Sequence, residues 1–275
     1  MVALSLIQPA QLRQQLAAAF TQLPTVQLAW QLGQQADTPG TAFFIGYQAA
    51  MRCLDKQLPP DCWAAFAISE RGVRDPRQMH TTFNTDSGRL QGQKSHVMLA
   101  GQGLDRVCIV ARPAAAGENL LALWLDASLV SVLPANPQPF LPDLPHVPAS
   151  FDTLLPASAL FSPDAHRHCN KPFRYWEDVH LTLALAGWLQ SQVAVDVALV
   201  DAVQQAFARQ PGYYDLAALD AVEALMAHLA QVAVGLSPAA AAQWQRDTVL
   251  LQFTAPLRAK IRQRLQQTSD LFNAP

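Results

Sequence analysis

The segment KPFRYWEDVHLTLALAGWLQ, residues 171–190, places two carboxylates and a histidine directly before an almost uninterrupted apolar run. Glu177 shares one stripe of the expected helix with three apolar residues, at offsets of four, seven and eleven: Leu181, Ala184 and Trp188. Because the helix is apolar nearly all round beyond Glu177, this stripe is expected to be buried. A carboxyl group at the edge of such a stripe has a raised pKa and can take a proton from a substrate near neutral pH.

A second interpretation of Glu177 is purely structural. The helix dipole favours an acid in the first turns of a helix, and Arg174 is three residues earlier, where it can form an ion pair with Glu177. Asn170 is a suitable N-cap and Pro172 suits the first turn, so Glu177 is close to the helix start. His180 is expected to be a core histidine whose ring is hydrogen-bonded. The residues alone leave both interpretations of Glu177 open.

Other catalytic or metal-binding patterns are weak in this sequence. HRHC, residues 166–169, holds two histidines and a thiol, but a metal site needs three or four converging ligands, and no second cluster is visible. No metal is therefore expected. The four cysteines are scattered with no C-x-x-C pair, which is typical of free thiols in a reducing compartment. No Gly-x-Ser-x-Gly elbow anchors a hydrolase triad.

Composition indicates a globular protein. Of 275 residues, 51% are hydrophobic and 15% are charged, and the formal net charge is −2. No run of Lys and Arg stands out, which argues against nucleic acid as the main partner. No basic n-region precedes an apolar core at the N-terminus, and no apolar run reaches the ~18 residues that a membrane span needs. We therefore expect no membrane span and a cytoplasmic location.

Around this segment, the hydrophobic period changes twice along the chain. Residues 9–58 carry two apolar stripes at helical spacing, separated at Asp37–Gly40 and ended by Pro59 and Pro60. Residues 61–160 instead form short segments rich in strand-favouring residues between turn residues, which predicts an antiparallel sheet or small barrel. Within this region, the prolines of residues 136–150 predict a rigid, extended surface segment.

Helical spacing returns over residues 170–268. Four helices are expected, with breaks at Pro211–Gly212 and Gly235–Pro238: residues 171–192, 195–209, 215–235 and 238–268. Short connections between them predict an antiparallel bundle. The predicted fold class is therefore an α+β multidomain protein with three parts: an N-terminal helical region (1–60), a central antiparallel β-domain (61–160) and a C-terminal four-helix bundle (161–275).

Two segments of the central region, FAISERGVRDP (66–76) and GRLQGQKSHVMLAGQGLDRVCIVAR (88–112), resemble the acyl-CoA dehydrogenase family. In that family a strand ends in an aromatic residue and a Thr-Glu pair, a Gly-x-Lys-x-Trp-Ile-Thr strand follows, and an Ala-Asp step enters another strand. The positions that match these three elements are Phe66, Ser69 and Glu70, then Gly92, Lys94 and Val97, then Asp105. The domain order also agrees, and the resemblance spans roughly residues 40–265.

The resemblance implies a flavoprotein, an FAD-dependent oxidoreductase that acts on CH–CH groups. Its reaction would be the α,β-dehydrogenation of an acyl thioester bound to CoA or to a carrier protein, and its assembly a homodimer or homotetramer. The cofactor-binding positions that it implies are Phe66, Ile68, Ser69, Arg74, His96, Val97 and Met98.

The resemblance also implies a position for the base. The commonest family base lies in a Tyr-Glu-Gly turn near the C-terminus, and ungapped counting places Thr254-Ala255-Pro256 there, without a carboxylate. A minority of the family carries the base on the first bundle helix instead. Counting back from Gly187, taken as the glycine of that helix, leads to Glu177. The resemblance therefore favours Glu177 as the catalytic base.

Several family features are replaced in this sequence. The Gly-Ser-Asp turn is Arg74-Asp75-Pro76, the flavin-shielding tryptophan is His96, and the threonine is Met98. The Arg-x-x-Phe-Gly loop that reaches the FAD of a neighbouring subunit is not found. These departures keep an alternative open, in which the chain is a catalytically silent member of the same fold that acts as a binding or assembly subunit.

Overall fold

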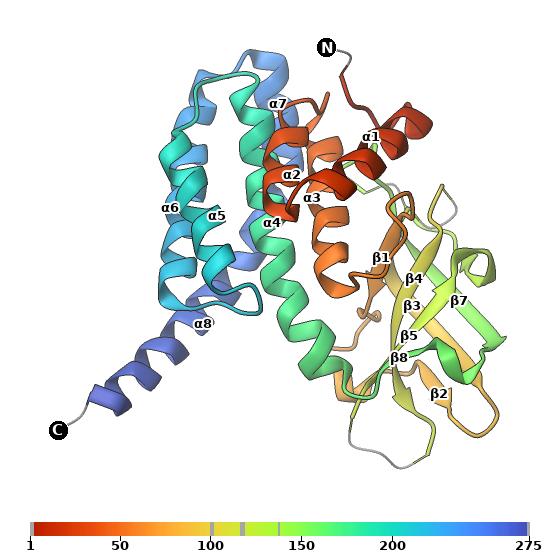
Figure 1. Ribbon diagram of the computed structural model, residues 1–275. Coiled ribbons are helices and arrows are strands. Elements are labelled where there is room, and N and C mark those ends of the chain that lie inside the picture. The colour runs from red at the N-terminus through yellow and green to blue at the C-terminus, as the bar shows by residue number, and fades with distance from the viewer. Residues whose placement is uncertain (1–2, 100–101, 116–118, 137, 274–275) are drawn as a thin grey trace. The chain divides into compact units, whose positions relative to one another are not determined.

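The chain folds into two compact units, as seen in a computed structural model that describes residues 3–99, 102–115, 119–136 and 138–273. The first unit contains residues 1–53, 139–141 and 174–275, and the second contains residues 54–138 and 142–173. The N-terminal and C-terminal helices thus share one unit (Figure 1). The three-part division at residues 60 and 160 stays a prediction.

The helices are, in chain order, α1 (Pro9–Gln22), α2 (Thr25–Gly33), α3 (Pro39–Leu54), α4 (Lys171–Gln190), α5 (Val197–Arg209), α6 (Leu216–Val232), α7 (Pro238–Asp247) and α8 (Val249–Asn273). Three of the later helices begin at side-chain caps, since Asp196, Asp215 and Ser237 accept N–H groups from the first turns of α5, α6 and α7. Local sequence therefore fixes where these helices start.

Two expected helices are each divided in the structure. Residues 9–36 form α1 and α2 rather than one helix, because Pro24 ends the first and is the N-cap of the second. The expected helix 238–268 is α7 and α8, which meet at Thr248. Just before this break, the buried Asp247 carboxylate pairs with Arg246 and accepts the N–H of Leu141 at 2.8 Å. The C-terminal part therefore holds five helices in the described chain, not four.

Helix α4 packs against the N-terminal helices through glycines. A Cβ atom on Gly187 would lie 2.4 Å from the Trp30 carbonyl of α2, and one on Gly33 of α2 would lie 2.2 Å from the Ala184 carbonyl of α4. Gly46 of α3 approaches the His180 carbonyl in the same way. Figure 1 shows α4 between α2 and α3 on one side and α5 and α6 on the other. The stripe predicted to be buried, Leu181, Ala184 and Trp188, is at most 5% exposed.

Helix α6 differs from one sequence expectation. Among the described residues, Leu216–Gly235 is long and apolar enough to cross a membrane by length and composition alone. Five residues of α6 are buried inside the protein, namely Ala218, Leu219, Val222, Leu225 and Leu229, and 28% of the apolar window is buried. Core helices of water-soluble proteins pass the same test, so the property by itself is weak evidence for a span.

The second unit is built on a mixed sheet. Its strands are β1 (Ala64–Ala67), β2 (Thr82–Asn84), β3 (Arg89–Met98), β4 (Arg106–Pro113), β5 (Leu121–Asp126), β6 (Ser131–Val132), β7 (His146–Leu154) and β8 (Leu160–Ser162). Their order is β6-β7-β3-β2-β4-β5-β8, and β1 also pairs with β4. The prediction of an antiparallel sheet is wrong in part, because β1 and β2 both run parallel to β4. Their shared partner, β4, follows them in the sequence only after the long strand β3. The order of neighbouring segments along the chain therefore did not predict this parallel pairing.

Strand β7 was not predicted from the sequence. The proline-rich segment was expected to be a surface segment, yet residues 146–154 pair with β3 along most of its length. The β3–β7 register shifts between Lys94 and Val97, which leaves Ser95 and His96 opposite Pro148. Proline is tolerated in sheets at such bulges and at edges. The bulge frees the Ser95 N–H, which donates to the Ser69 carbonyl at 2.9 Å.

The α2–α4 contact gives a test of this packing. We expect Gly187→Ala to lower the free energy of unfolding by about 1–3 kcal/mol, because its methyl group meets backbone rather than a movable side chain. Gly212→Ala is the matched control, since a Cβ there meets nothing within 4 Å. Urea unfolding of both variants measures the difference. Equal stability of the two variants would contradict the close approach.

Candidate active site

The residues expected to hold a cofactor lie at one end of β1 and on the adjacent part of β3, all in the second unit. Phe66 and Ile68 are partly exposed, and Ser69 is exposed directly after β1. The Ile68 carbonyl accepts a hydrogen bond from Lys94 Nζ at 3.3 Å, next to the Ser95–Ser69 bond. The chain thus brings segments about 25 residues apart into contact where the motif match placed them.

On β3, the three expected positions differ in exposure. His96 is exposed at the bulge, and its Nδ1 lies 2.9 Å from the Ser95 hydroxyl. Val97 and Met98 are 1% and 4% exposed. Their side chains are therefore buried by the protein itself, and His96 is the β3 residue of this set whose side chain is free to meet a ligand.

Beneath these residues lies a buried ion pair. Lys94 Nζ is 2.8 Å from Glu70 Oε1, and the two side chains are 0% and 5% exposed. Glu70 also accepts the backbone N–H groups of His80 and Thr81, the latter at 3.1 Å. Burial lowers the pKa of Lys94 to about 8, although Glu70 opposes this shift. Burial alone raises the pKa of Glu70, but hydrogen bonds from Lys94, Thr81 and His80 outweigh it and lower it.

Glu70 therefore joins three elements: the end of β1, strand β3 and the segment that enters β2. Both residues were recognised in the sequence as motif positions, but not as partners. The signal was their presence in one motif, because a buried acid and a buried lysine need each other for neutralisation. The pair fixes the course of the loop on which Arg74 lies.

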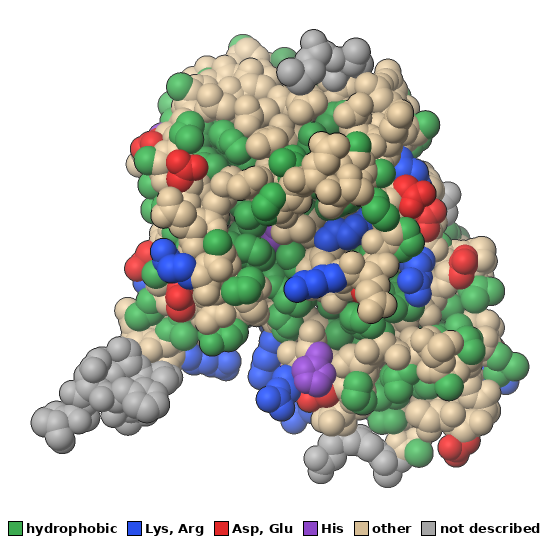
Figure 2. Space-filling view, viewed as in Figure 1, with side chains coloured by type: hydrophobic (Ala, Val, Ile, Leu, Met, Phe, Trp, Pro, Cys, Tyr) green, Lys and Arg blue, Asp and Glu red, His purple; other side chains and the backbone are tan. Residues whose placement is uncertain are grey.

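Arg74 is exposed on that loop, and it has no ion pair with any other residue that the structure describes. Its neighbour Asp75 is engaged, because it pairs with Arg77 at 2.8 Å and caps the short helix Pro76–Gln78. On the face drawn in Figure 2, Lys and Arg side chains lie in several small groups between hydrophobic and neutral side chains. Arg74 is thus able to meet an anion from solvent.

Glu177 lies on α4 in the first unit and is partly buried. Burial, together with the neighbouring Asp178 carboxylate, raises the pKa of Glu177 to about 7, while Arg174 opposes the shift. Its carboxylate makes no hydrogen bond to any part of the chain that the structure describes. A carboxyl group with a free lone pair and a pKa near neutrality has the properties of a general base.

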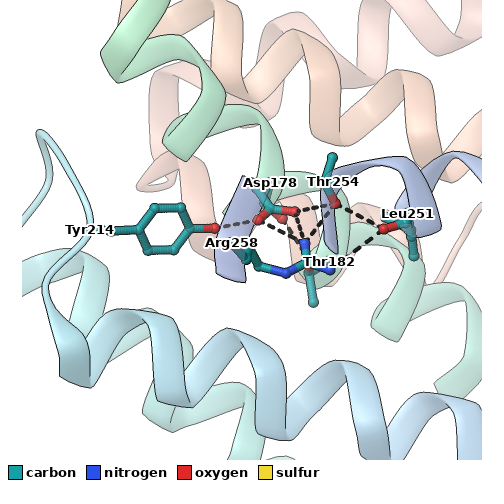
Figure 3. A network of polar contacts seen from close by, with 6 residues as sticks. All are labelled: Asp178, Thr182, Tyr214, Leu251, Thr254 and Arg258. Atoms are coloured by element: carbon teal, nitrogen blue, oxygen red, sulfur yellow. Dashed lines mark hydrogen bonds and ion pairs between the residues drawn. The ribbon is translucent and has the colours of Figure 1, made fainter. Parts of the chain in front are cut away.

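Asp178, the next residue, has a different environment (Figure 3). Its carboxylate lies 2.8 and 3.0 Å from Arg258 Nη1 of α8, and the Tyr214 hydroxyl donates a short hydrogen bond to it. Thr254 Oγ1 lies 3.5 Å from the same carboxylate and accepts a hydrogen bond from Arg258 at 2.6 Å. Burial and Asp178 raise the pKa of Tyr214, so this hydroxyl stays a donor. The sequence gave no signal for this network, whose members are up to 80 residues apart.

His180 is a satisfied core histidine, as expected. It is fully buried, its Nδ1 lies 2.6 Å from the Trp176 carbonyl, and its Nε2 lies 2.8 Å from the Thr25 hydroxyl. A carbonyl only accepts, so Nδ1 carries the proton and Nε2 accepts from Thr25. Burial lowers the pKa of His180 to about 4, so the neutral ring has its hydrogen bonds and is a weak base.

No group of three or more metal-ligating side chains lies together in the described part of the chain. Residues 166–169 form most of a π-helix, His166–Asn170, directly before α4. His168 Nδ1 lies 3.2 Å from the Ser162 hydroxyl, and burial raises the pKa of Cys169 to about 11. His168 and Cys169 thus both interact with Ser162, which lies just before this π-helix.

Solved structures resemble this fold over most of the chain. FkbI, a protein for biosynthesis of the methoxymalonyl extender unit of the polyketide immunosuppressant Fk520, has a TM-score of 0.69 at 13% identity, covering 94% of this chain and 92% of that one. XiaF from Streptomyces sp., in complex with FADH2 and glycerol, has a TM-score of 0.65 at 15% identity, covering 97% and 88%.

Butyryl-CoA dehydrogenase from Megasphaera elsdenii matches with a TM-score of 0.50 at 14% identity, covering 75% of this chain and 58% of the enzyme. The chain thus spans less than two thirds of that enzyme. No family model matches the sequence, and no curated protein matches it significantly. The chain has the fold of the acyl-CoA dehydrogenases, with N-terminal helices, a mixed sheet and C-terminal helices, as the motif resemblance implied.

The buried ion pair of the second unit is testable by stability. We expect Lys94→Met to lower the free energy of unfolding by about 3–5 kcal/mol, because Glu70 is left buried without its cation. Arg89→Met on the same strand is the matched control, since its pair with Asp152 is well exposed and its loss should change stability little. Urea unfolding measures both. A small loss for Lys94→Met would show that the pair does not hold the loop.

The raised pKa of Glu177 is testable by NMR. The chain has four glutamates, at positions 70, 118, 177 and 223, so ¹³C-carboxyl labelling of glutamate gives few signals, and Glu177→Gln assigns one. We expect that signal to titrate at a pH of about 7. Since the folded pKa exceeds the unfolded one, this group makes the protein less stable as the pH rises from about 4.5 to 7. An ordinary glutamate value of about 4.3 would instead favour the structural interpretation.

Proposed function

We propose that this protein is an FAD-dependent oxidoreductase that removes hydrogens from Cα and Cβ of an acyl thioester, with Glu177 as the base. The observation that carries the proposal is the Glu177 carboxylate, which is partly buried, has a pKa of about 7 and lacks a hydrogen-bond partner in the described chain. The fold supports the proposal, because XiaF was solved with FADH2 and another structure of this fold is a butyryl-CoA dehydrogenase.

The residues of the second unit suit a flavin nucleotide. Ser69 and His96 are exposed polar side chains whose segments are joined by the Ser95–Ser69 hydrogen bond, and they offer hydrogen bonds to the polar edge of a ring. Partly exposed Phe66 and Ile68 offer apolar contact. Arg74 offers charge to a pyrophosphate, in place of the small residues of the Gly-Ser-Asp turn. Contacts from Val97 and Met98 would have to come from the main chain, because their side chains are buried.

The proposed chemistry divides between the cofactor and the chain. FAD, when bound, supplies the acceptor for the hydride that leaves Cβ. Glu177 accepts the proton from Cα on its carboxylate, and the electron pair of that C–H bond forms the new double bond. A base with a pKa close to neutrality is ionised in a large fraction of molecules yet basic enough to remove such a proton. The thioester carrier, CoA or a carrier protein, belongs to the same proposal.

A second candidate is a catalytically silent protein of the same fold that acts as a binding or assembly subunit. One observation favours it: Thr254, Ala255 and Pro256, at the position of the commonest family base, lie inside helix α8 and supply no carboxylate. The homodimer or homotetramer and the cytoplasmic location stay predictions under both candidates. Light scattering of the purified protein measures the oligomeric state.

The visible spectrum of protein purified without added cofactor separates the two candidates. We expect a yellow protein with flavin absorbance that is bleached by butyryl-CoA or by longer acyl-CoA thioesters. Glu177→Gln should keep the flavin absorbance and lower the bleaching rate by about 10²–10⁴-fold. Glu223→Gln, which changes a glutamate of α6 that pairs with Arg262, is the matched control and should bleach normally.

Two results would overturn this proposal. A colourless protein that takes up no FAD in a titration supports the silent subunit. A yellow protein in which Glu177→Gln bleaches as fast as the wild type removes Glu177 from the reaction while leaving the flavin assignment in place.

A further inference from the structure

A thiol, an imidazole and a hydroxyl lie together where three helices of the first unit pack. Cys53 comes from the end of α3, His180 from α4 and Thr25 from the start of α2. Thr25 Oγ1 lies 2.8 Å from His180 Nε2 and 3.6 Å from Cys53 Sγ. Cys53 Sγ lies 3.9 Å from His180 Nε2. The proposed dehydrogenation uses none of these three side chains.

The three donor atoms are spaced as ligands of one small ion. A triangle with sides of 2.8, 3.6 and 3.9 Å has a circumscribed radius of about 2.0 Å, so one point lies at that distance from all three atoms. Movement of this point out of the plane lengthens all three distances. Zinc binds imidazole nitrogen at about 2.0–2.1 Å, oxygen at about 2.0–2.2 Å and thiolate sulfur at about 2.3 Å. The separations therefore fit three ligands of one zinc ion.

His180 has the surroundings of a metal ligand. Its Nδ1–H donates to the Trp176 carbonyl at 2.6 Å, which leaves the lone pair of Nε2 directed at Thr25. Metal-binding histidines usually donate their other ring N–H to a carbonyl or a carboxylate in this way. Burial lowers the pKa of His180 to about 4, so protons do not compete with a metal ion for Nε2 at neutral pH. The Phe207 ring packs edge-on at 5.1 Å and helps to hold the imidazole.

The thiol and the hydroxyl supply a route from solvent. Cys53 is partly exposed, whereas the other three cysteines of the chain are buried. Thr25 is also partly exposed. The helices that carry the thiol and the imidazole are held closely together, because a Cβ on Gly46 of α3 would lie 2.6 Å from the His180 carbonyl of α4. The donors thus have fixed positions before an ion arrives.

No local motif marks this cluster in the sequence. Thr25 and His180 are 155 positions apart, and Cys53 and His180 are 127 positions apart. Two of the donors come from residue types that commonly bind metals, and a hydroxyl supplies the third. The cluster is therefore not a group of three His, Cys, Asp or Glu side chains, and the pattern of these residues along the chain does not predict it.

We propose that Cys53, His180 and Thr25 bind a thiophilic divalent metal ion of the zinc class. The Cys53 thiol releases its proton to solvent as the metal–sulfur bond forms, because the thiolate is the ligand. The protein then supplies three of four tetrahedral positions, and the fourth is left for water or another ligand. This inference does not depend on the proposed function, since the residues assigned to the flavin and to the base are different ones.

Cobalt(II) is the probe for this site, because it occupies the tetrahedral sites of zinc but, unlike zinc, absorbs visible light. Titration of the untagged, metal-free whole chain with cobalt chloride should give one equivalent of binding and thiolate-to-cobalt absorbance in difference spectra. Zinc chloride should then displace the cobalt. Cys53→Ser should abolish the thiolate absorbance. The matched control, Cys62→Ala, should keep the absorbance, because Cys62 is a buried cysteine outside the cluster.

His180 and Thr25 are tested by zinc affinity. His180→Gln should weaken zinc binding by at least the roughly 10–100-fold that loss of an outer-shell partner costs. Thr25→Val keeps the shape of the side chain but removes its oxygen, and it should also weaken binding. Thr25→Ser restores the hydroxyl and should bind as the wild type does. The Thr25 pair keeps the test decisive where His180→Gln prevents folding.

Two results would overturn the inference. One is a wild-type protein without thiolate-to-cobalt absorbance, or with absorbance that Cys53→Ser leaves unchanged. The other is iodoacetamide labelling of Cys53, read by mass spectrometry, that saturating zinc does not slow. Neither measurement uses flavin binding or turnover. A protein that binds zinc but no flavin therefore overturns the proposed function alone, and an active flavoprotein without the cobalt absorbance overturns the metal site alone.

Discussion

The close approach of α4 to its neighbours is the constraint on which the first unit depends. Gly33, Gly46 and Gly187 let the backbones of α2 and α3 lie against α4, at distances that leave no room for a side chain. Beyond its second turn α4 is buried on almost every face, so it has no polar surface. Charged groups are therefore restricted to its first turns, where Glu177 and Asp178 lie. The rigid packing of one end of the helix fixes the position of the titratable groups at the other.

Each unit contains one buried ion pair beside the residues proposed to act, and the two pairs have different effects. Lys94 and Glu70 close a loop and satisfy two backbone N–H groups, so the residues next to them gain a defined position. Arg258 and Asp178 also join separate elements, but Asp178 is adjacent to a carboxyl group without partners. The first pair orders main chain, and the second ties α4 to α8.

The parts of the fold predictable from sequence were those with a local cause. Helical period, Pro172 and the apolar run gave α4, and the same period placed Glu177 on a buried stripe. The expected N-cap Asn170 is instead part of the π-helix His166–Asn170, which runs directly into α4. The mixed sheet was not predictable, because β1 and β2 pair with a strand beyond an intervening hairpin. Strand β7 was hidden by the prolines that precede it and by Pro148 within it, which lies opposite a bulge that no local sequence pattern predicts. The partners of Asp178 were missed for the same reason, because a contact between residues 80 positions apart leaves no periodic pattern in the sequence.

Residues 254–256 of α8, which supply no carboxylate, are connected to the Asp178 network through Thr254. Ala255 occupies the position counted to the commonest family base, and the hydroxyl of its neighbour Thr254 accepts from Arg258, the cation that holds Asp178. The Ala255 side chain is exposed, whereas Thr254 lies beside the buried Asp178–Arg258 pair, so these two neighbouring positions of α8 differ in environment. Thr254 supplies that pair with a hydrogen bond and adds no charge next to Asp178, where a like charge would be costly. This part of α8 therefore holds Asp178 of α4 in place, and residues 254–256 supply no carboxylate of their own.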